Sequence, residues 1–219
     1  MTNDQFPAED FLNAGYQALF NGQKTYNGVA LITKQSTTEA IYDIPKLEDP
    51  QRRVIGAKVS DVFVLNLYIP NGSEVDSEKY HYKLNWLNHL QNLIGDLIKQ
   101  HSKMAIMGDF NIAPKDEDVH DPDAWRDKIL CSEPEREQFQ KILGQGFHDC
   151  FRLFEQEKAI FSWWDYRAAG FRRNHGLRID HILASDALKG LCQGCSIDKT
   201  PRKLERPSDH APVIAEFEL

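Results

Sequence analysis

The sequence predicts an α/β or α+β layered sandwich, in which mixed β-sheets pack against helices. Short apolar runs rich in β-branched and aromatic residues alternate along the chain with longer stretches of helical periodicity. Two of these runs, residues 53–59 and 62–69, flank the turn at Ser60-Asp61 and predict a hairpin. Hairpins combined with crossover helices imply sheets of mixed direction, covered by helices.

Each further element rests on a local signal. The hairpin ends at the turn sequence Pro70-Asn71-Gly72, and Tyr80, Leu84 and Leu87 begin an apolar repeat of three and four residues that predicts a long helix. Pro134 suits the first turn of a later helix. In chain order, the predicted elements outside the hairpin are a strand at 28–33, a helix from about 76 to 101, a strand at 104–107, a helix at about 134–143, and strands at 177–183 and 211–217.

Composition narrows the class of protein. The chain has 219 residues, 41% of them hydrophobic, which excludes collagen-like, low-complexity and strongly disordered chains. With 26 Lys+Arg against 33 Asp+Glu, the net charge is −7, which argues against coating nucleic acid by bulk charge but permits a local basic face. No apolar stretch is long enough to span a membrane, and the first residues do not resemble a secretory signal. We therefore expect a cytoplasmic protein with no membrane partner.

The four cysteines are sparse. Cys192 and Cys195 form a CxxC pair, which is found in zinc sites and in redox pairs, but Cys131 and Cys150 lack the spacing that would complete a zinc site. Reduced, partly buried thiols are the expectation, and the sequence does not assign a role to Cys192 and Cys195.

Polar residues at the ends of predicted strands carry the candidate chemistry. Asp109 and Asn111 follow the strand at 104–107 and share one face of an extended segment. A carboxylate beside an amide oxygen suits a hard divalent cation such as Mg²⁺, although an Asx turn would use the same residues. Asp180 lies in an apolar run, where a carboxylate needs a partner, and His210 of the Asp209-His210 pair is the natural one.

A stretch of aromatic and basic residues is the remaining candidate. Trp163 and Trp164 lead into residues 166–178, which hold four arginines and no acidic residue. Arginines interleaved with aromatics suit phosphate contact and stacking. The alternative is that some aromatics, Trp164 above all, belong to the core and that the arginines are simply solvated.

Together these motifs resemble the exonuclease III family, the bacterial abasic-site endonucleases of the endonuclease/exonuclease/phosphatase superfamily. The strings that carry the resemblance run in family order from Gln5-Phe6-Pro7 to the C-terminus and cover practically the whole chain. They are Asn66-Leu67-Tyr68-Ile69-Pro70-Asn71-Gly72, Gly108-Asp109-Phe110-Asn111-Ile112, Phe161-Ser162-Trp163, Gly176-Leu177-Arg178-Ile179-Asp180 and Ser208-Asp209-His210-Ala211-Pro212.

The resemblance implies a four-layer α/β sandwich of two mixed β-sheets flanked by helices, and a monomeric DNA repair nuclease of base excision repair. The implied reaction is Mg²⁺-dependent phosphodiester hydrolysis, 5′ to abasic sites or stepwise from the 3′ ends of double-stranded DNA, with Mn²⁺ as a possible substitute. By resemblance, Asp109, Asn111 and Asp209 are metal ligands, and the catalytic residues are Tyr68, Asp109, Asn111, Asp180 and His210. The implied substrate-binding residues are Asn71, Trp163, Arg167, Asn174, Leu177 and Arg178.

One departure from the family pattern is large. Family members begin with a strand, a helix and a second strand that carry an Asn-x-Asn-Gly-type motif and a Gln-Glu-Thr string, whose glutamate is the principal metal ligand. Neither string occurs in this sequence. We expect residues 1–219 to form a single domain that lacks this segment, with unpaired strand edges, poor Mg²⁺ binding and little or no activity by itself.

Two other functions remain open at this stage. A phosphatase or phospholipase of the same superfamily, similar to sphingomyelinases, would share Gly108-Asp109-Phe110-Asn111 and Ser208-Asp209-His210. An inactive DNA-binding remnant would keep the groove without the chemistry. The balance of exonuclease against abasic-site endonuclease activity, and the number of metal ions, do not follow from the sequence.

Overall fold

A computed structural model describes all residues, 1–219. Its centre is a six-stranded mixed sheet with the order β3-β4-β5-β6-β10-β7. Only β5 and β6 are parallel; the other neighbours are antiparallel. The strands of this sheet are β3 (Thr37–Tyr42), β4 (Val54–Val59), β5 (Val62–Tyr68), β6 (Met104–Asp109), β7 (Phe147–Asp149) and β10 (Asp180–Ser185).

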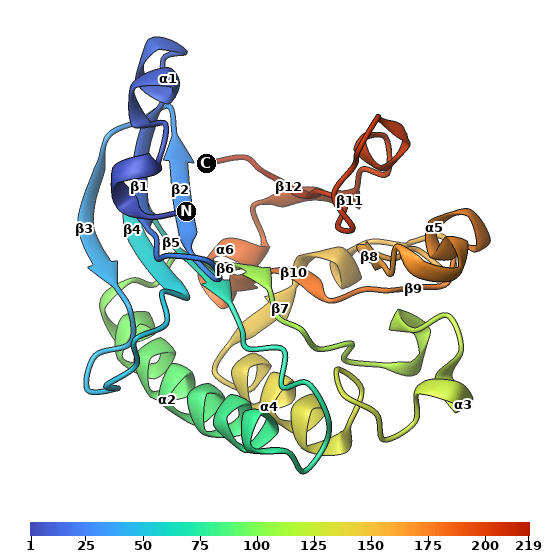
Figure 1. The fold of residues 1–219 in the computed structure, drawn as a ribbon. Helices are drawn as coiled ribbons and strands as arrows, with labels where there is room; N and C mark the ends of the chain where they lie inside the picture. The colour runs from blue at the N-terminus through green and yellow to red at the C-terminus, as the bar shows by residue number, and fades with distance from the viewer.

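Two long helices cover one face of this sheet (Figure 1). They are α2 (Glu78–Gln100) and α4 (Glu133–Leu143), and α2 is the crossover that makes β5 and β6 parallel. Alternate residues of β5, Phe63, Leu65 and Leu67, point toward the helices and are almost fully buried, as the period of two along a strand requires. The predicted hairpin, long helix and central strand are therefore confirmed.

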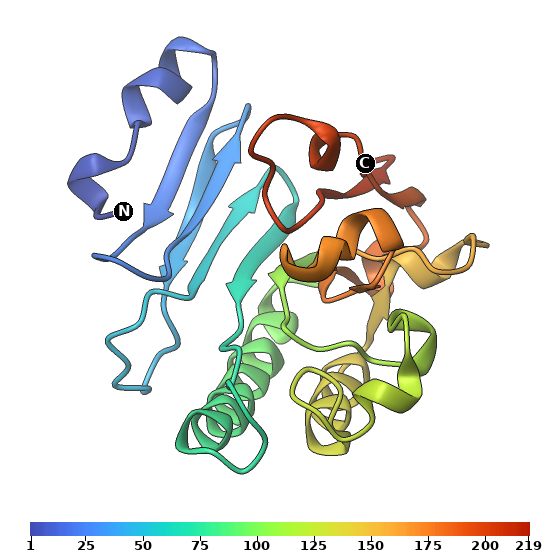
Figure 2. The ribbon, with the colours of Figure 1, turned by 45° about the vertical axis from the view of Figure 1, so that its right-hand side comes forward.

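The opposite face carries a second β layer in two separate pieces (Figure 2). One is the hairpin of β1 (Gln17–Asn21) and β2 (Val29–Thr33), which packs on β4 through Leu31. The other pairs β11 (Cys192–Ile197) with β12 (Val213–Phe217). The expected fold is confirmed as a mixed α/β sandwich, but neither β2 nor β12 pairs with a strand beyond its own hairpin partner, so the second sheet is not continuous.

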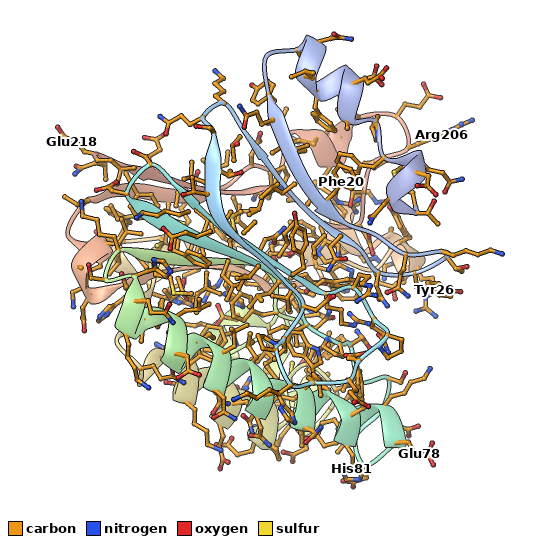
Figure 3. The ribbon with its side chains drawn as sticks, turned by 90° about the vertical axis from the view of Figure 1, so that its left-hand side faces the viewer. Phe20, Tyr26, Glu78, His81, Arg206 and Glu218 are labelled. Atoms are coloured by element: carbon orange, nitrogen blue, oxygen red, sulfur yellow. The ribbon has the colours of Figure 1, made fainter.

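Short elements fill the ends of the chain and the loops. Phe20 of β1 stacks on Phe6 at a ring-centroid distance of 4.2 Å and so fixes the N-terminal segment over the first hairpin (Figure 3). The short elements are the helices α1 (Ala8–Asn13), α3 (Pro122–Trp125), α5 (Gly170–Arg173) and α6 (Asp186–Lys189), and the two-residue strands β8 (Trp163–Trp164) and β9 (Gly176–Leu177). None of the helices combines the length and the apolar character needed to cross a membrane.

The single strand predicted at residues 177–183 is wrong, because the chain changes partners there. β9 pairs with β8, whereas β10, starting at Asp180, joins the central sheet between β6 and β7. Between them the backbone N–H of Arg178 donates to the carbonyl of Asp118, which belongs to neither ladder. Asp180 is therefore the first residue of an interior strand, at the strand's end rather than inside an apolar run.

Candidate active site

Three polar residues lie in one row across neighbouring strands. In the parallel ladder Tyr68, the last residue of β5, is the partner of Asp109, the last residue of β6. In the antiparallel ladder the same Asp109 is the partner of Asp180, the first residue of β10. The sheet register itself therefore brings together three residues that are up to 112 positions apart in the chain.

Asp109 is fixed from both sides of its carboxylate. The Asn111 backbone N–H donates to Oδ1 at 2.8 Å and the Asn111 side-chain amide donates to Oδ2 at 3.0 Å. Asn111 holds this position with a positive φ of 49°, a left-handed conformation that asparagine tolerates better than most residues. Burial, followed by the charge of Asp180, raises the pKa of Asp109 to about 7, against the opposing effect of His210.

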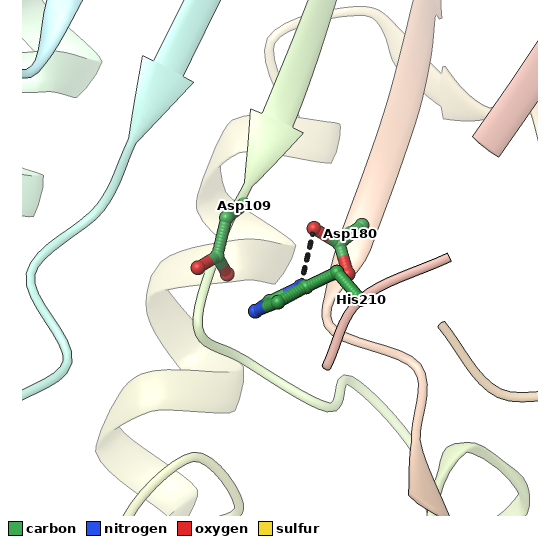
Figure 4. Close-up of side chains that lie close together, drawn as sticks. All are labelled: Asp109, Asp180 and His210. Atoms are coloured by element: carbon green, nitrogen blue, oxygen red, sulfur yellow. Dashed lines mark hydrogen bonds and ion pairs between the residues drawn. The ribbon is translucent and has the colours of Figure 1, made fainter. Parts of the chain in front are cut away.

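His210 faces Asp109 from the loop before β12 (Figure 4). Its Nδ1 donates to Asp180 Oδ2 at 2.9 Å, the contact expected from the sequence. Asp180 is held in turn by Ser162, whose Oγ donates to Oδ2 at 2.7 Å. Burial alone would lower the pKa of His210, but the hydrogen bond and charge of Asp180 raise it to about 9, with a further contribution from Asp109. His210 is therefore protonated at neutral pH.

Asp209 and Trp163 form a second contact in the same loop. The indole Nε1 of Trp163 donates to Asp209 Oδ2 at 3.0 Å, and the backbone N–H of Trp164 donates to the Asp209 carbonyl at 3.0 Å. Trp163 is partly exposed while Trp164 is completely buried, as expected from the sequence. The side chain of Asp209 is thus oriented by a tryptophan rather than by a histidine or a lysine.

The other flank of the row is open and polar. Arg53 lies over the ring of Tyr68, with its guanidinium carbon 4.8 Å from the ring centroid, and donates to the Tyr68 carbonyl. Burial and the charge of Asp109 raise the pKa of Tyr68, so its hydroxyl stays protonated and can donate a hydrogen bond. A groove of about 510 Å³ begins here; Gln51, Arg53, Tyr68 and the exposed Asn71 are among its lining residues.

Three ligand atoms, one each from Asp109, Asp180 and His210, lie within 4.8 Å of one another. The carboxylate of Asp109 forms no ion pair with a lysine or arginine. Its oxygens can therefore serve as ligands of a hard divalent cation. Asn111 Oδ1 instead accepts from Asn71 Nδ2 at 3.0 Å, and Asp209 lies outside the three-residue group. Of the predicted metal ligands, Asp109 therefore fits best, and these residues alone offer few oxygen donors.

Two predicted substrate-binding residues are not accessible. Arg178 is 1% exposed, and its guanidinium binds the carboxylates of Asp118 and Asp149 at 2.7 Å each. Leu177 is completely buried, beneath Trp163 as its strand partner. Burial within the protein leaves Arg178 and Leu177 almost no solvent-exposed surface in this structure, so both support neighbouring residues of the site, and direct substrate contact by them stays a prediction.

Two others occupy the rim in different ways. Asn174 accepts from the Trp164 indole and donates to the Ala159 carbonyl, so its amide is used within the loop. Arg167 is highly exposed and pairs only with its neighbour Asp165. Of the predicted basic contacts, Arg167 is the one whose cation reaches solvent.

Two supporting residues were not identified from the sequence. Ser162 holds Asp180, and it could have been identified from its position next to Trp163 in the string Phe161-Ser162-Trp163. Lys83 is completely buried beneath the site. It could have been identified from its place on the apolar stripe of α2, three residues after Tyr80 and four before Leu87. A charged residue on a buried helix face requires partners, and the partners of Lys83 are site residues.

Comparisons with known proteins agree with this geometry. Residues 2–210 match the model of the endonuclease/exonuclease/phosphatase family. The chain is 40% identical to an exodeoxyribonuclease III of Haemophilus influenzae, over 99% of this chain and 86% of that protein. Among solved structures, the 3′ phosphatase NExo from Neisseria, bound to a product DNA hairpin, superposes with a TM-score of 0.98 at 45% identity, and an AP endonuclease from Archaeoglobus fulgidus with 0.95 at 36%. Each structural match covers 100% of this chain and 86% of the other.

Proposed function

The chain belongs to the endonuclease/exonuclease/phosphatase family and is a DNA repair nuclease, a phosphodiester hydrolase of the exonuclease III kind, and from this premise we propose its substrate and mechanism. The proposed reaction is metal-dependent hydrolysis of double-stranded DNA 5′ to abasic sites and stepwise from 3′ ends. The observation that carries the proposal is the row of Tyr68, Asp109 and Asp180, with the protonated His210 facing Asp109.

The two titrating groups suit opposite roles in phosphodiester hydrolysis. Asp109, with a pKa of about 7, is poised to accept a proton from the attacking water near neutral pH. His210, with a pKa of about 9, keeps a positive charge that stabilises the negative charge developing on the phosphate. Asp180, itself held by Ser162, fixes the orientation of the imidazole, because it occupies Nδ1 and leaves Nε2 available to the substrate.

The phosphate is proposed to lie between His210 and the amide side of the row. Asn71 is exposed, and its Nδ2 already donates to Asn111, which leaves the second N–H of the same amide for a phosphate oxygen. The hydroxyl of Tyr68 is a second donor beside it. The open groove next to Tyr68 and Asn71 gives the strand that carries the phosphate a path into the site.

We propose Mg²⁺ as the metal, with Mn²⁺ as a substitute, held by Asp109 and, through water, by Asp209. Bound there, the ion supplies a Lewis acid that neutralises the phosphate and its leaving oxygen. No glutamate contributes to the group formed by Asp109, Asp180 and His210. We therefore propose that residues 1–219, as a single domain, bind Mg²⁺ weakly and need high metal concentrations for cleavage.

Recognition of an abasic site is proposed to use Trp163. Its ring is partly exposed at the rim, braced by Leu177 below and by Asp209 at the indole nitrogen. A flat apolar wall at this place suits a flipped-out sugar that has lost its base. Arg167 and the exposed Arg172 and Arg173 add positive charge for the flanking phosphates.

A DNA 3′ phosphatase activity is a second candidate. The solved structure that is 45% identical to this chain and superposes with a TM-score of 0.98 is itself a 3′ phosphatase bound to a product DNA hairpin. The same Asp109 and His210 would hydrolyse a terminal phosphomonoester if the rim admits only the end of a strand. Sphingomyelin and inositol phosphates are not favoured, because the aromatic and arginine-rich rim suits a nucleic acid.

The test uses three duplex oligonucleotides, carrying an internal abasic site, an unmodified 3′ end or a 3′ phosphate. Each is incubated with the protein in EDTA and over Mg²⁺ and Mn²⁺ series carried to saturation, with sphingomyelin and an inositol phosphate as controls. Metal-dependent cleavage at the abasic site or 3′ end supports the main proposal, and phosphate release alone supports the second candidate. Binding of the duplexes in EDTA with no cleavage at any metal concentration contradicts both and indicates a DNA-binding remnant.

We also propose a cellular location and an oligomeric state. All four cysteines are free, which suits a reducing compartment such as the cytoplasm. A monomer is proposed, because a single chain contributes every residue of the site described above. Gel filtration with light scattering tests the monomer directly.

A further inference from the structure

Lys83 lies in the interior of the protein with no exposed surface, on the buried stripe of α2. Removing an ammonium group from water is costly, so a fully buried lysine is rare unless it is paired and hydrogen-bonded. Burial lowers the pKa of Lys83, and the charge and hydrogen bond of Glu135 act in the opposite direction. The free-energy cost of burying this ammonium group indicates that Lys83 has a role other than packing.

The three N–H groups of Lys83 have three partners. One is the carboxylate of Glu135, also completely buried, which forms an ion pair with the ammonium. The other two are main-chain carbonyls, that of Asn71 at 3.1 Å and that of Asn111 at 2.7 Å. Two of the three bonds thus go to the backbone of the two asparagines that follow β5 and β6 at the active site.

Both carbonyls belong to irregular backbone that no strand or helix supports. Asn111 has a φ of 49°, and Gly72, directly after Asn71, has a φ of 93°. A buried carbonyl in such a turn needs a donor from elsewhere, and Lys83 is that donor. The turn also rests on the lysine side chain, because a Cβ at Gly72 would lie 3.2 Å from Lys83 Cδ.

Glu135 anchors the other end of the ion pair. Its carboxylate accepts from the backbone N–H groups of Leu130 and Ser132, each at 3.1 Å, and from Ser132 Oγ at 2.7 Å. These contacts close the first turn of α4, so the carboxylate cannot move without opening the helix start. The ammonium of Lys83 is consequently held at a fixed point relative to both helices.

The position of Lys83 is transmitted to the reacting groups by two further bonds. Asn71 Nδ2 donates to Asn111 Oδ1, and Asn111 Nδ2 donates to the carboxylate of Asp109, each at 3.0 Å. A shift of either backbone therefore moves the amide proposed to bind phosphate and the carboxylate proposed to accept a proton. Displacements well below a bond length already reduce the rate of a preorganised site.

From these contacts we propose that Lys83, clamped by Glu135, is a positioning residue that joins the turns after β5 and β6. It thereby preforms the phosphate-binding amide of Asn71 and the Asn111 amide that orients Asp109. The proposal rests on the proposed phosphodiesterase function, and it assigns to the Lys83–Glu135 pair an effect on phosphate binding beyond its effect on stability. The pair does not touch the substrate itself.

The test separates positioning from stability with two apolar variants. K83M leaves the Glu135 charge unpaired and buried, so it is expected to lower the melting temperature strongly. K83M/E135M removes both charges and is expected to regain most of that loss, because buried ion pairs are often replaceable by apolar residues. Neither variant restores the donor for the two carbonyls, so both are expected to bind a duplex with an abasic site at least about 10-fold more weakly than wild type in EDTA, with KM raised more than kcat is lowered.

Y80F is the matched control. Tyr80 lies one turn before Lys83 and its hydroxyl contacts Ser132 Oγ at 2.7 Å, but it has no bond to Asn71 or Asn111. Y80F is therefore expected to lose some stability and to keep the wild-type affinity and KM. If K83M/E135M folds and binds the duplex with wild-type affinity, Lys83 has only a structural role and the proposal is overturned.

A second variant keeps the test decisive where the double variant does not fold. E135Q retains the shape of the side chain but removes the charge that holds Lys83. In E135Q the NMR signals of the Asn71 and Asn111 side-chain amides are expected to shift from their wild-type positions, and to shift further than they do in the control Y80F. Unchanged signals in E135Q would contradict the proposal. A wild-type protein that does not bind the duplex at all would instead refute the proposed function, while the amide signals would still report on Lys83.

Discussion

The two halves of the site are built in different ways. Tyr68, Asp109 and Asp180 lie at the ends of three adjacent strands, where ladder hydrogen bonds set their spacing. His210 and Asp209 lie in the loop before β12, and that loop is held largely by individual contacts. These contacts are Asp180 with His210, Trp163 with Asp209, Tyr166 with the Pro207 carbonyl, Arg202 with the Ser208 carbonyl, and the Ser162 carbonyl with the Ala211 N–H.

Because of this difference, we expect the two halves to respond differently to substitution. In the strand half the position of each side chain is set by the backbone, so exchanging one side chain changes the chemistry but leaves the backbone geometry unchanged. In the loop half, two main-chain bonds to residues 162 and 164 are supplemented by side-chain contacts that hold the rest of the backbone, so exchanging one of those side chains can alter both the chemistry and the geometry. Substitutions in each half can therefore distinguish the two modes of support.

Asp109→Asn is expected to reduce kcat/KM for abasic-site cleavage by about 1000-fold, because the proposed proton acceptor is lost while the size of the side chain is kept. The melting temperature is expected to stay equal or to rise, since burial disfavours the Asp109 charge. Steady-state kinetics and thermal melts on the same preparation check both. A large fall in melting temperature would show that the strand half is not independent of its side chains.

Asp180 lies in the strand half and holds His210 of the loop half. Asp180→Asn is therefore expected to lower kcat/KM about 100-fold. The hydrogen bond and charge of Asp180 raise the pKa of His210 to about 9, so without that charge the pKa falls toward its ordinary value of 6.5. The alkaline fall in activity should therefore move to lower pH. Kinetics from pH 5 to 10 check this, and an unmoved alkaline limb would separate Asp180 from His210.

Trp163→Phe is expected to have a smaller effect, about a 10-fold loss in kcat/KM. The variant keeps an aromatic wall but removes the N–H that orients Asp209 at 3.0 Å. Tyr166→Phe is the matched control, because it removes one loop contact at an exposed ring and leaves Asp209 untouched. Equal losses in the two variants would mean that the loop responds to loosening in general and not to the orientation of Asp209.

Much of the fold could be predicted because its central elements carry strong signals. The run at 62–69 and the repeat from Tyr80 to Leu97 are buried on one side, so their patterns have a single interpretation. β3 was missed because Thr37-Thr38-Glu39 lies at the sheet edge and is largely exposed. β1 and β11 lack a clear alternation for a similar reason, since each belongs to a two-stranded piece.

The residues that face the site could be predicted from the sequence, but the buried residues that hold them in place could not. Asp109, Asp180 and His210 stand out because a charged or titratable group follows or interrupts an apolar run. Arg178 was grouped with the solvent-facing arginines because a basic, acid-free stretch has the same composition whether it faces water or carboxylates distant in sequence. The partners of Arg178, Asp118 and Asp149, lie 60 and 29 residues away, so only the tertiary structure shows the pairing.

The smallest expected effect concerns stability. Because the pKa of His210 is raised above its unfolded value of 6.5 to about 9, its contribution is complete below pH 6.5 and is lost as the pH rises through 9. The metal-free protein should therefore lose about 2 kcal/mol of unfolding free energy over this range. Urea unfolding in EDTA at several pH values checks the slope, and His210→Asn should flatten it. An unchanged slope in that variant would assign the pH dependence to other groups.

The central claim is that an ionised Asp109 and a protonated His210 act together on a phosphodiester. The most direct test is the pH dependence of kcat/KM for cleavage of a duplex with one abasic site, at saturating metal, for wild type and His210→Asn. We expect wild-type activity to rise through an acidic limb at or below about pH 7 and to fall near pH 9, and we expect the variant to lose the alkaline fall along with about 100-fold in rate. A variant that retains the fall near pH 9 would show that a protonated His210 is not the group on which the activity depends.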